Sequence, residues 1–222
     1  LSGSDSVLLN TVPRSDSIQV LRVITPADGV AHDTVPVLRR PVPGSPVFPS
    51  PDGRWLAAGG WMNVPGESGH VIRLYEFATG RLVTLLKGHS NVVTGLAFAP
   101  DGGRLISGSF DTTAIIWDVE GRRLAHHLKG HRDHIYAVAF TTDATRAVTG
   151  SDDTALKLWS AGDGREIATL SGHKDKVRSV AVSAADGMVA SGSFDGEIRL
   201  WDGRSGKFIR SFQSPTTGVG AL

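Results

Sequence analysis

The sequence predicts an all-β protein, and three observations support this prediction. The 222 residues include 27 glycines and 11 prolines, which separate short runs of β-branched and aliphatic residues. Such punctuation is typical of many short strands joined by turns. No stretch shows a convincing 3.6-residue apolar period, so no amphipathic helix is predicted. A unit of 42 residues recurs three times, since His89, His131 and His173 are evenly spaced, which indicates a repeat architecture.

Composition and charge describe an ordinary folded protein. Hydrophobic residues make up 40% of the chain and charged residues 20%, unlike the balance of a disordered segment. The net charge of +1 provides no global field to recruit nucleic acid or an anionic membrane. No apolar run approaches the roughly 20 residues that span a bilayer. No signal peptide is visible after Leu1, and we expect a cytoplasmic protein.

Motifs for cofactors and metals are missing from the sequence. The chain has no cysteine, which excludes disulfides and thiolate metal sites. Phosphate-binding loops and nucleotide fingerprints are absent, because the glycine-rich segments lack the Lys-Ser/Thr of a phosphate cradle. We therefore predict no cofactor and no metal.

The three repeats align without a gap over residues 88–129, 130–171 and 172–213. Each contains a Gly-His pair, a segment such as LISGS, AVTGS or VASGS, a turn with an aspartate, and a tryptophan. Four strand-like runs fit in each repeat, and the more polar fourth run suits an outer edge. One four-stranded sheet cannot bury both of its faces, whereas sheets stacked around an axis can. The repeat therefore predicts a β-propeller of four-stranded antiparallel blades.

These residues resemble the WD40-repeat family, closely over residues 88–213 and more loosely upstream. Trp117-Asp118 and Trp201-Asp202 match the Trp-Asp pair of that family, and the middle repeat has Trp159-Ser160. In the family, the histidine, the strand serine or threonine, the turn aspartate and the tryptophan hydrogen-bond within each blade. The resemblance implies three structural sets, which we call the braces: His89, Ser107, Asp111 and Trp117; His131, Thr149, Asp153 and Trp159; and His173, Ser191, Asp195 and Trp201.

A histidine, a serine and an aspartate also invite a hydrolase interpretation. A catalytic triad needs one exposed nucleophile beside one oriented base, and it has no reason to recur three times. A polar group buried between sheets costs about 1–3 kcal/mol if it is left unpaired. A satisfied network avoids that cost and fixes which loop meets which strand. We therefore predict a structural role for the braces and a protein that is not an enzyme.

The pattern weakens outside the three repeats but continues. Residues 45–87 are predicted to form a degenerate blade with an enlarged loop around Trp61. Residues 1–44 are predicted to hold a degenerate partial blade and a proline-rich connection, and residues 214–222 to begin a further strand. The chain is thus predicted to be a single propeller, or a contiguous part of one, with four nearly complete blades and partial blades at the termini. Seven such blades would need roughly 290 residues, so we favour a part of a longer propeller over a short five-bladed ring.

Function is expected on exposed loops, because the braces are internal. In WD40-repeat proteins the narrower face, built by loops entering the first strand and by the second-to-third turns, commonly binds partners. The columns that fall there vary between repeats and include residue types that anchor interfaces. The alternative is that their aromatic residues cover the blade edges. The partner-binding candidates are Thr94, Tyr136, Arg178, His134, Lys176, Phe110, Asp152, Phe194 and Trp61.

A small basic cluster falls on the last repeat. Lys174, Lys176 and Arg178 could meet an acidic peptide or a phosphorylated partner. The alternative is a solvated turn that Asp175 balances.

A histidine-rich segment, HHLKGHRDH, could suggest a metal site. His131 belongs to a brace, however, and the adjacent His126 and His127 point to opposite faces of a strand. No other repeat contains such a cluster, so no metal site is predicted here.

The sequence therefore predicts a non-catalytic protein–protein interaction scaffold. Braced blades would hold variable loops in fixed relative positions, and a short segment or loop of a partner protein would dock across them. Such pre-organisation lowers the ordering cost of binding. The alternative is a regulatory or substrate-recruiting propeller of a larger enzyme, such as a bacterial kinase or a caspase-like protease.

Overall fold

The computed structural model describes residues 8–10, 17–21, 38–39, 47–60, 70–214 and 218–219. Strands and their turns account for this part of the chain, which confirms the prediction of an all-β protein. The same residues contain no helix of the length and apolarity needed to cross a membrane. The loop around Trp61 lies outside the described residues.

Sixteen strands form four antiparallel sheets of four strands each, which we call blades 1 to 4. Blade 1 contains β4 (Val47–Pro49), β5 (Trp55–Ala58), β6 (His70–Glu76) and β7 (Leu82–His89). Blade 2 contains β8 (Val93–Phe98), β9 (Arg104–Ser109), β10 (Ala114–Asp118) and β11 (Arg123–Leu128). Blade 3 contains β12 (Ile135–Phe140), β13 (Arg146–Ser151), β14 (Leu156–Ser160) and β15 (Glu166–Leu170). Blade 4 contains β16 (Val177–Val182), β17 (Val189–Ser193), β18 (Glu197–Trp201) and β19 (Phe208–Gln213).

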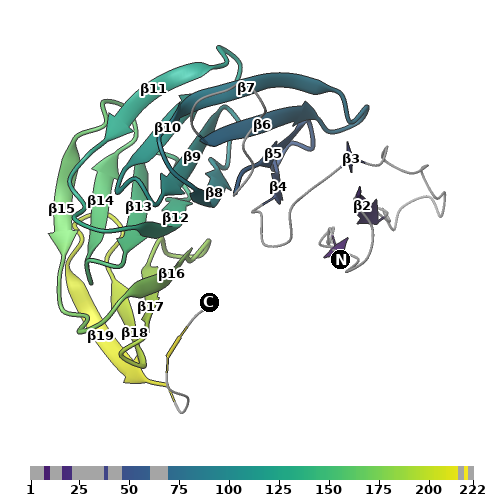
Figure 1. Ribbon diagram of the computed structural model, residues 1–222. Helices are drawn as coiled ribbons and strands as arrows, with labels where there is room; N and C mark the ends of the chain where they lie inside the picture. Colours follow the sequence, from purple (N-terminus) through teal and green to yellow (C-terminus); the bar gives the residue numbers. More distant parts are fainter. Residues whose placement is uncertain are drawn as a thin grey trace.

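The blades follow one another along an arc (Figure 1). The first strands β8, β12 and β16 lie on the inside of the arc, and the fourth strands β11, β15 and β19 lie on the outside. Upstream, β1 (Leu8–Asn10), β2 (Ser17–Leu21) and β3 (Leu38–Arg39) pair in that order in a separate antiparallel sheet. The two residues of β3 fall within the proline-rich stretch that the sequence assigns to a connection.

Apolar residues from neighbouring blades meet in a recurring pattern between the sheets. One blade supplies alternate residues of its third strand and the last leucine of its fourth, such as Leu156, Leu158 and Leu170. The next blade supplies a first-strand residue and its tryptophan, such as Val177 and Trp201. Burial of this surface drives the stacking, since each buried aliphatic side chain stabilises the fold by about 1.5–3 kcal/mol.

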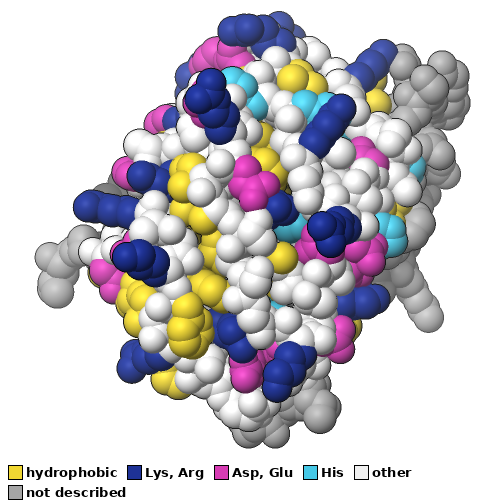
Figure 2. Space-filling model, turned by 90° about the vertical axis from the view of Figure 1, so that its left-hand side faces the viewer, with side chains coloured by type: hydrophobic (Ala, Val, Ile, Leu, Met, Phe, Trp, Pro, Cys, Tyr) yellow, Lys and Arg dark blue, Asp and Glu magenta, His cyan; other side chains and the backbone are white. Residues whose placement is uncertain are grey.

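The outer strands are less polar than the sequence indicates. Leu124 on β11, Ile167 on β15, and Phe208 and Ile209 on β19 are exposed. Figure 2 faces this side of the molecule and shows hydrophobic side chains gathered in a band among interspersed basic and acidic ones. Phe208 packs against Trp201 in a T-shaped arrangement, so part of this apolar surface covers the tryptophan from outside.

The first strands of blades 2, 3 and 4 are bulged at the same place. The antiparallel register between first and second strands shifts between Val93 and Gly95, and again at the two corresponding places in blades 3 and 4. The extra residues are Thr94, Tyr136 and Arg178. A bulge releases its extra residue from the ladder and redirects its side chain, so this backbone irregularity presents a residue at the start of these three inner strands.

Candidate functional site

The first brace links the loop that enters blade 2 to the interior of that blade. Trp117 Nε1–H donates to Ser107 Oγ over 2.9 Å. The Ser107 hydroxyl lies 2.8 Å from His89 Nε2, and His89 Nδ1 lies 2.8 Å from an Asp111 carboxylate oxygen. A neutral imidazole that donates from Nδ1 to the carboxylate accepts at Nε2, so one tautomer satisfies both contacts.

The other two braces repeat this geometry. In blade 3, His131 lies 2.8 Å from the Thr149 hydroxyl and 2.7 Å from the Asp153 carboxylate. Trp159 Nε1–H donates to the same hydroxyl over 2.9 Å. In blade 4 the same three distances, among His173, Ser191, Asp195 and Trp201, are 2.8, 3.0 and 2.9 Å. The structure therefore brings together every member of the three sets that the sequence singles out.

The brace hydroxyls lie in the blade interior. Ser107, Thr149 and Ser191 are each 0% exposed. A nucleophile must reach a substrate, and each of these hydroxyls instead has a tryptophan N–H on one side and an imidazole on the other. The arrangement shares the connectivity of a hydrolytic triad but provides no access for an acyl group.

The brace aspartates also gather backbone N–H groups. Asp153 accepts from Arg132 N–H and Ala155 N–H, at 2.9 and 3.0 Å. Burial by itself raises the pKa of Asp153, but these bonds and the His131 contact outweigh it and lower the pKa to about 2. Asp111 has its pKa lowered in the same way by His89, Thr113 and Ser90. The ionised carboxylates thus hold both loops of each blade end.

A second hydroxyl column, which the sequence analysis leaves out, supports the same turns. Ser109, Ser151 and Ser193 are buried, and each donates to a carbonyl of the entering loop over 2.9–3.1 Å. Each also accepts the N–H of the brace aspartate two residues later, at 3.1 Å. The signal was present in the sequence, because this column is serine in all three repeats.

The bulged residues meet the turns of the preceding blade. We define the rim cluster as the seven side chains that adjoin one another at the turn end of blades 2 to 4: Phe110, His134, Tyr136, Asp152, Lys176, Arg178 and Phe194. Phe110 stacks on His134, with 4.3 Å between ring centroids, and tilts against Tyr136 at 5.1 Å. Seven of the nine partner-binding candidates therefore form one continuous group.

The rim cluster contains an ion pair across the interface between blades 3 and 4. Arg178 Nε and Nη2 lie 2.9 and 3.0 Å from the two Asp152 carboxylate oxygens. Lys176 Nζ lies 3.5 Å from the same carboxylate, and the Asp152 side chain is only 3% exposed. Asp152, rather than Asp175, is the carboxylate that pairs with the basic side chains of this cluster.

Aromatic rings flank the guanidinium of Arg178. Its central carbon lies 3.5 Å from the Tyr136 ring centroid and 5.0 Å from that of Phe194. Cation–π contacts of this kind contribute about 0.5–2 kcal/mol. Together with the hydrogen bond and ion pair to Asp152, they fix the position of Arg178 and of the two rings.

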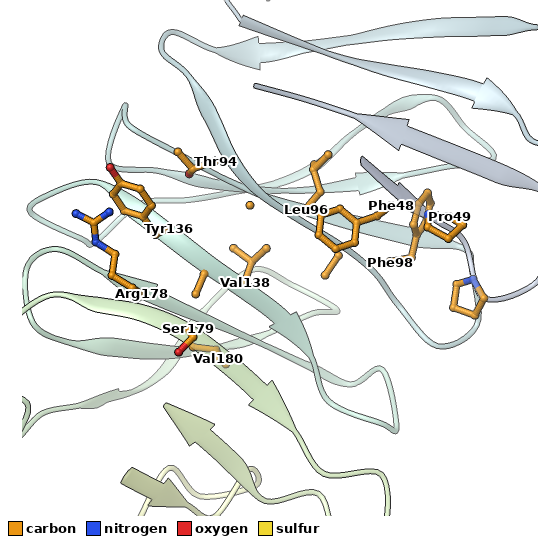
Figure 3. A pocket seen from close by; sticks show the side chains of 14 residues that line it. Phe48, Pro49, Thr94, Leu96, Phe98, Tyr136, Val138, Arg178, Ser179 and Val180 are labelled. Atoms are coloured by element: carbon orange, nitrogen blue, oxygen red, sulfur yellow. The ribbon is translucent and has the colours of Figure 1, made fainter. Parts of the chain in front are cut away.

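The eighth candidate lies beside a groove on the inside of the arc. Thr94 donates its hydroxyl to Gly108 O, at 3.1 Å, and to Ile135 O of the next blade. A groove of about 460 Å³ begins near Thr94, Tyr136 and Arg178 and continues to Phe48 and Phe98. Figure 3 shows the polar group at one end of the groove and the two phenylalanines at the other. The ninth candidate, Trp61, lies outside the described residues.

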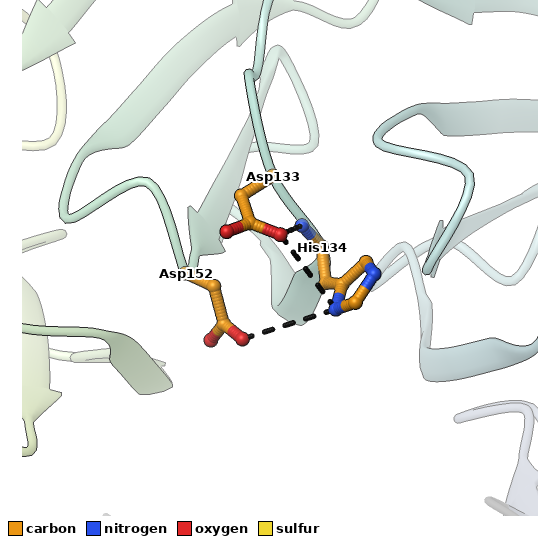
Figure 4. A group of neighbouring side chains, drawn as sticks. All are labelled: Asp133, His134 and Asp152. Atoms are coloured by element: carbon orange, nitrogen blue, oxygen red, sulfur yellow. Dashed lines mark hydrogen bonds and ion pairs between the residues drawn. The ribbon is translucent and has the colours of Figure 1, made fainter.

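One group at the rim has the composition of a metal site. Ligand atoms of Asp133, His134 and Asp152 lie within 4.8 Å of one another, as Figure 4 shows. The Asp152 carboxylate already pairs with Arg178 and Lys176, whose positive charges oppose a cation at the same oxygens. The donor set therefore fits a metal ion poorly. His126 and His127 sit on β11, away from this group.

Fold and site together define a repeat scaffold of stacked four-stranded blades, each tied by an internal hydrogen-bond network. Three stretches of the chain, residues 80–118, 122–160 and 164–202, match the family model described as WD domain, G-beta repeat. They make up just over half of the sequence. The chain belongs to the WD40-repeat family, which confirms the resemblance that its motifs indicate.

Curated relatives match short stretches of the chain. Periodic tryptophan protein 2 homolog of Neurospora crassa is 49% identical over 51 residues, which cover 23% of this chain and 6% of the relative. Nuclear distribution protein nudF of Emericella nidulans is 48% identical over 59 residues, covering 26% and 13%. Serine-threonine kinase receptor-associated protein of Dictyostelium discoideum is 37% identical over 54 residues, covering 24% and 18%.

The chain therefore spans less than a fifth of the length of these relatives. WD40 repeats are generally non-catalytic and generally bind protein partners. Membership supports a protein-interaction scaffold as the general class.

Proposed function

We propose that this protein is a non-catalytic scaffold that binds a partner protein or peptide across the turn end of blades 2 to 4. The rim cluster is the docking surface, and the adjoining groove extends it along the inner strands. The observation that carries the proposal is the continuity of the cluster, because seven side chains from three blades touch in sequence.

Some members of the rim cluster face solvent and others hold them in place. Phe194 is 46% exposed, and the side chains of Lys176 and His134 are 45% and 41% exposed. Asp152 and Arg178 lie beneath them and fix their positions. An exposed aromatic ring beside a cation, held on a rigid support, is the kind of anchor that interface hot spots use.

The same division decides which substitutions can test the surface. Replacing Arg178 by an acidic residue would place two carboxylates together at a buried position and would destabilise the blade interface. Phe194→Ser with Lys176→Ser instead removes the two exposed neighbours of the Asp152–Arg178 pair and leaves that pair in contact. Arg165→Ser with Ile167→Ser is the matched control, because it also removes one cation and one exposed apolar residue, from the outer side of blade 3.

The test measures which proteins the tagged chain retains from a lysate of its native cells. We expect partners that bind the parent and the control variant to be lost from the Phe194→Ser, Lys176→Ser variant, while all three chains stay folded and the rim variant loses no more than about 2 kcal/mol of stability. Equal retention by both double variants would overturn the rim cluster as the docking surface.

The remaining properties follow from the same proposal. Since the brace hydroxyls are buried, the scaffold itself carries out no reaction and needs no cofactor. The net charge of +1 favours a protein or peptide partner over nucleic acid or a membrane surface. We place the protein in the cytoplasm.

A further inference from the structure

A pocket of about 340 Å³ lies on blade 3, between the loop that enters the blade and the turn after its second strand. Its lining includes two cations, Arg132 and Lys157, and three residues with hydroxyl groups, Thr154, Thr169 and Ser171. No residue of the rim cluster lines this pocket, so it is separate from the proposed docking surface.

Both cations of the pocket have hydrogen-bond donors to spare. Lys157 is only 9% exposed, and its ammonium donates to Glu166 and Thr169, each over 2.8 Å. An ammonium has three N–H donors, and no residue that the structure describes accepts the third. Arg132 donates its backbone N–H to Asp153, whereas its guanidinium has no acceptor in the described part of the chain. A buried cation with an unused donor favours an additional acceptor beside it.

Blade 4 shows which chemical group fits at this position. The counterpart of Lys157 is Arg199, and the counterpart of Ala155 is Glu197, each 42 positions later. Arg199 Nε–H donates to a Glu197 carboxylate oxygen over 2.7 Å. In blade 4 a carboxylate of the chain itself therefore meets the cation of the third strand. In blade 3 the corresponding residue is an alanine, which lines the pocket.

The formal charges around the pocket favour an anion. Lys129, one residue before the lining, adds a third positive charge to those of Arg132 and Lys157. Asp153 and Glu166 bring two negative charges, and both carboxylates already have partners within the blade. One further carboxylate would bring the local sum to zero, which is the complementarity that specific binding uses.

We propose that this pocket binds a carboxylate from another molecule, namely the side chain of a glutamate or aspartate in a partner segment. Lys157 and Arg132 hold it, in the way that a guanidinium holds a carboxylate in blade 4. Hydrogen bonds between ionised groups are about twice as strong as neutral ones, so the charged acid is preferred over its amide. The inference does not depend on the proposed docking surface.

The experiment titrates the full chain with two tripeptides, Gly-Glu-Gly and Gly-Gln-Gly, whose termini are both capped. NMR follows the backbone amides of Thr154, Ala155 and Lys157 at constant ionic strength, which separates binding from screening. We expect the glutamate peptide to shift these amides to saturation and the glutamine peptide to bind about tenfold more weakly or less. Equal shifts from the two peptides would overturn the inference.

Removal of one cation tests which residues hold the peptide. We expect Arg132→Ser to weaken binding of the glutamate peptide by about tenfold. Arg204→Ser is the matched control, because Arg204 is also exposed and also donates its backbone N–H to an aspartate, in a turn of blade 4. Its binding should equal that of the parent chain, and equal losses in both variants would contradict a site at the pocket.

A third comparison supplies the carboxylate from within the chain, as blade 4 does. Ala155→Glu should unfold at a higher urea concentration than Ala155→Gln, because only the glutamate pairs with Lys157. Ala155→Glu should also lose the response to the glutamate peptide. An unchanged response, or a lower urea midpoint than that of Ala155→Gln, would overturn the inference.

Discussion

Two adjacent aspartates in one turn of blade 3 have different roles. Asp153 belongs to a brace and binds His131 and two backbone N–H groups within its own blade. Asp152 belongs to the rim cluster and pairs with Arg178 of the next blade. The position of Asp153 is aspartate in all three repeats, whereas the position of Asp152 holds Phe110 in the first repeat and Phe194 in the third.

This fold tolerates variation at the rim but not at the braces. The surroundings of Asp153 are the same in every blade, because the histidine, the hydroxyl and the turn backbone recur. The surroundings of Asp152 depend on the bulged residue of the following blade, which is Tyr136 beside Phe110 and Arg178 beside Asp152. Each pair can change together without disturbing the blade, so the rim can be adapted to a partner while the brace stays fixed.

Loss of a brace tryptophan should have the largest effect. Trp159→Ala removes a fully buried ring and the donor to Thr149. We expect a loss of about 3–5 kcal/mol in the free energy of unfolding, measured by urea denaturation. Tyr136→Ala at the rim should cost about 1–2 kcal/mol, because its ring is only half-buried. Equal losses would contradict the division between brace and rim.

Acid should weaken the braces over a defined pH range. The pKa of Asp153 is about 2 in the folded protein, lower than its ordinary value of 3.8, because bonds from His131 and the backbone outweigh the effect of burial. A lowered pKa stabilises the fold above about pH 4, and this contribution is lost as the pH falls toward 2. We expect about 1–2 kcal/mol from this site. The free energy of unfolding, measured at several pH values between 5 and 2, should decline less in Asp153→Asn than in the parent.

Histidine gives a second pH range. Burial lowers the pKa of His173 below its ordinary value of 6.5, and its contact with Asp195 only partly opposes this. The folded state therefore favours neutral His173, and stability declines as the pH falls below 6.5. An NMR titration of the His173 ring should give a midpoint below that of an unfolded histidine, and a midpoint above it would contradict the preference of the folded state for neutral His173.

A half-buried ion pair in blade 3 should be replaceable by apolar residues. Lys157 Nζ lies 2.8 Å from Glu166, whereas blade 2 has Ile115 and Leu124 at the same positions. We expect Lys157→Ile with Glu166→Leu to change the free energy of unfolding by less than about 1 kcal/mol. Glu166→Leu alone should cost more, because it leaves the Lys157 ammonium without its carboxylate. A double variant that is less stable than this single one would contradict the prediction.

The smallest expected effect concerns backbone strain beside a brace. Thr154 has a φ of +72°, whereas the corresponding residue of blade 4 is Gly196, with a φ of +81°. A β-branched residue is strained in this region. Thr154→Gly should therefore raise the free energy of unfolding by about 0.5–1 kcal/mol. A lower stability would show that the threonine side chain contributes more than its strain costs.

Much of the fold could be predicted because the repeat is written in the sequence at one fixed spacing. The pairing of His89 with Ser107 rather than Ser109 needed the family resemblance, because the two serines stand two residues apart on one strand and spacing alone does not separate them. The ion pair of Asp152 with Arg178 could not be predicted, because the two residues lie on different blades and meet only through the stacking. Nor does any residue type mark the bulges at Thr94, Tyr136 and Arg178.

The Ser-His-Asp sets are structural, and the chemistry that varies between repeats lies at the rim. The free energies of unfolding of Asp153→Ala and Phe194→Ala test this division. Asp153→Ala leaves three donors without a carboxylate and should cost about 2–4 kcal/mol. Phe194→Ala should cost about 1 kcal/mol or less, because its ring is 46% exposed and Arg178 keeps its contacts with Tyr136 and Asp152. An Asp153→Ala chain as stable as the parent would contradict the structural role of the braces.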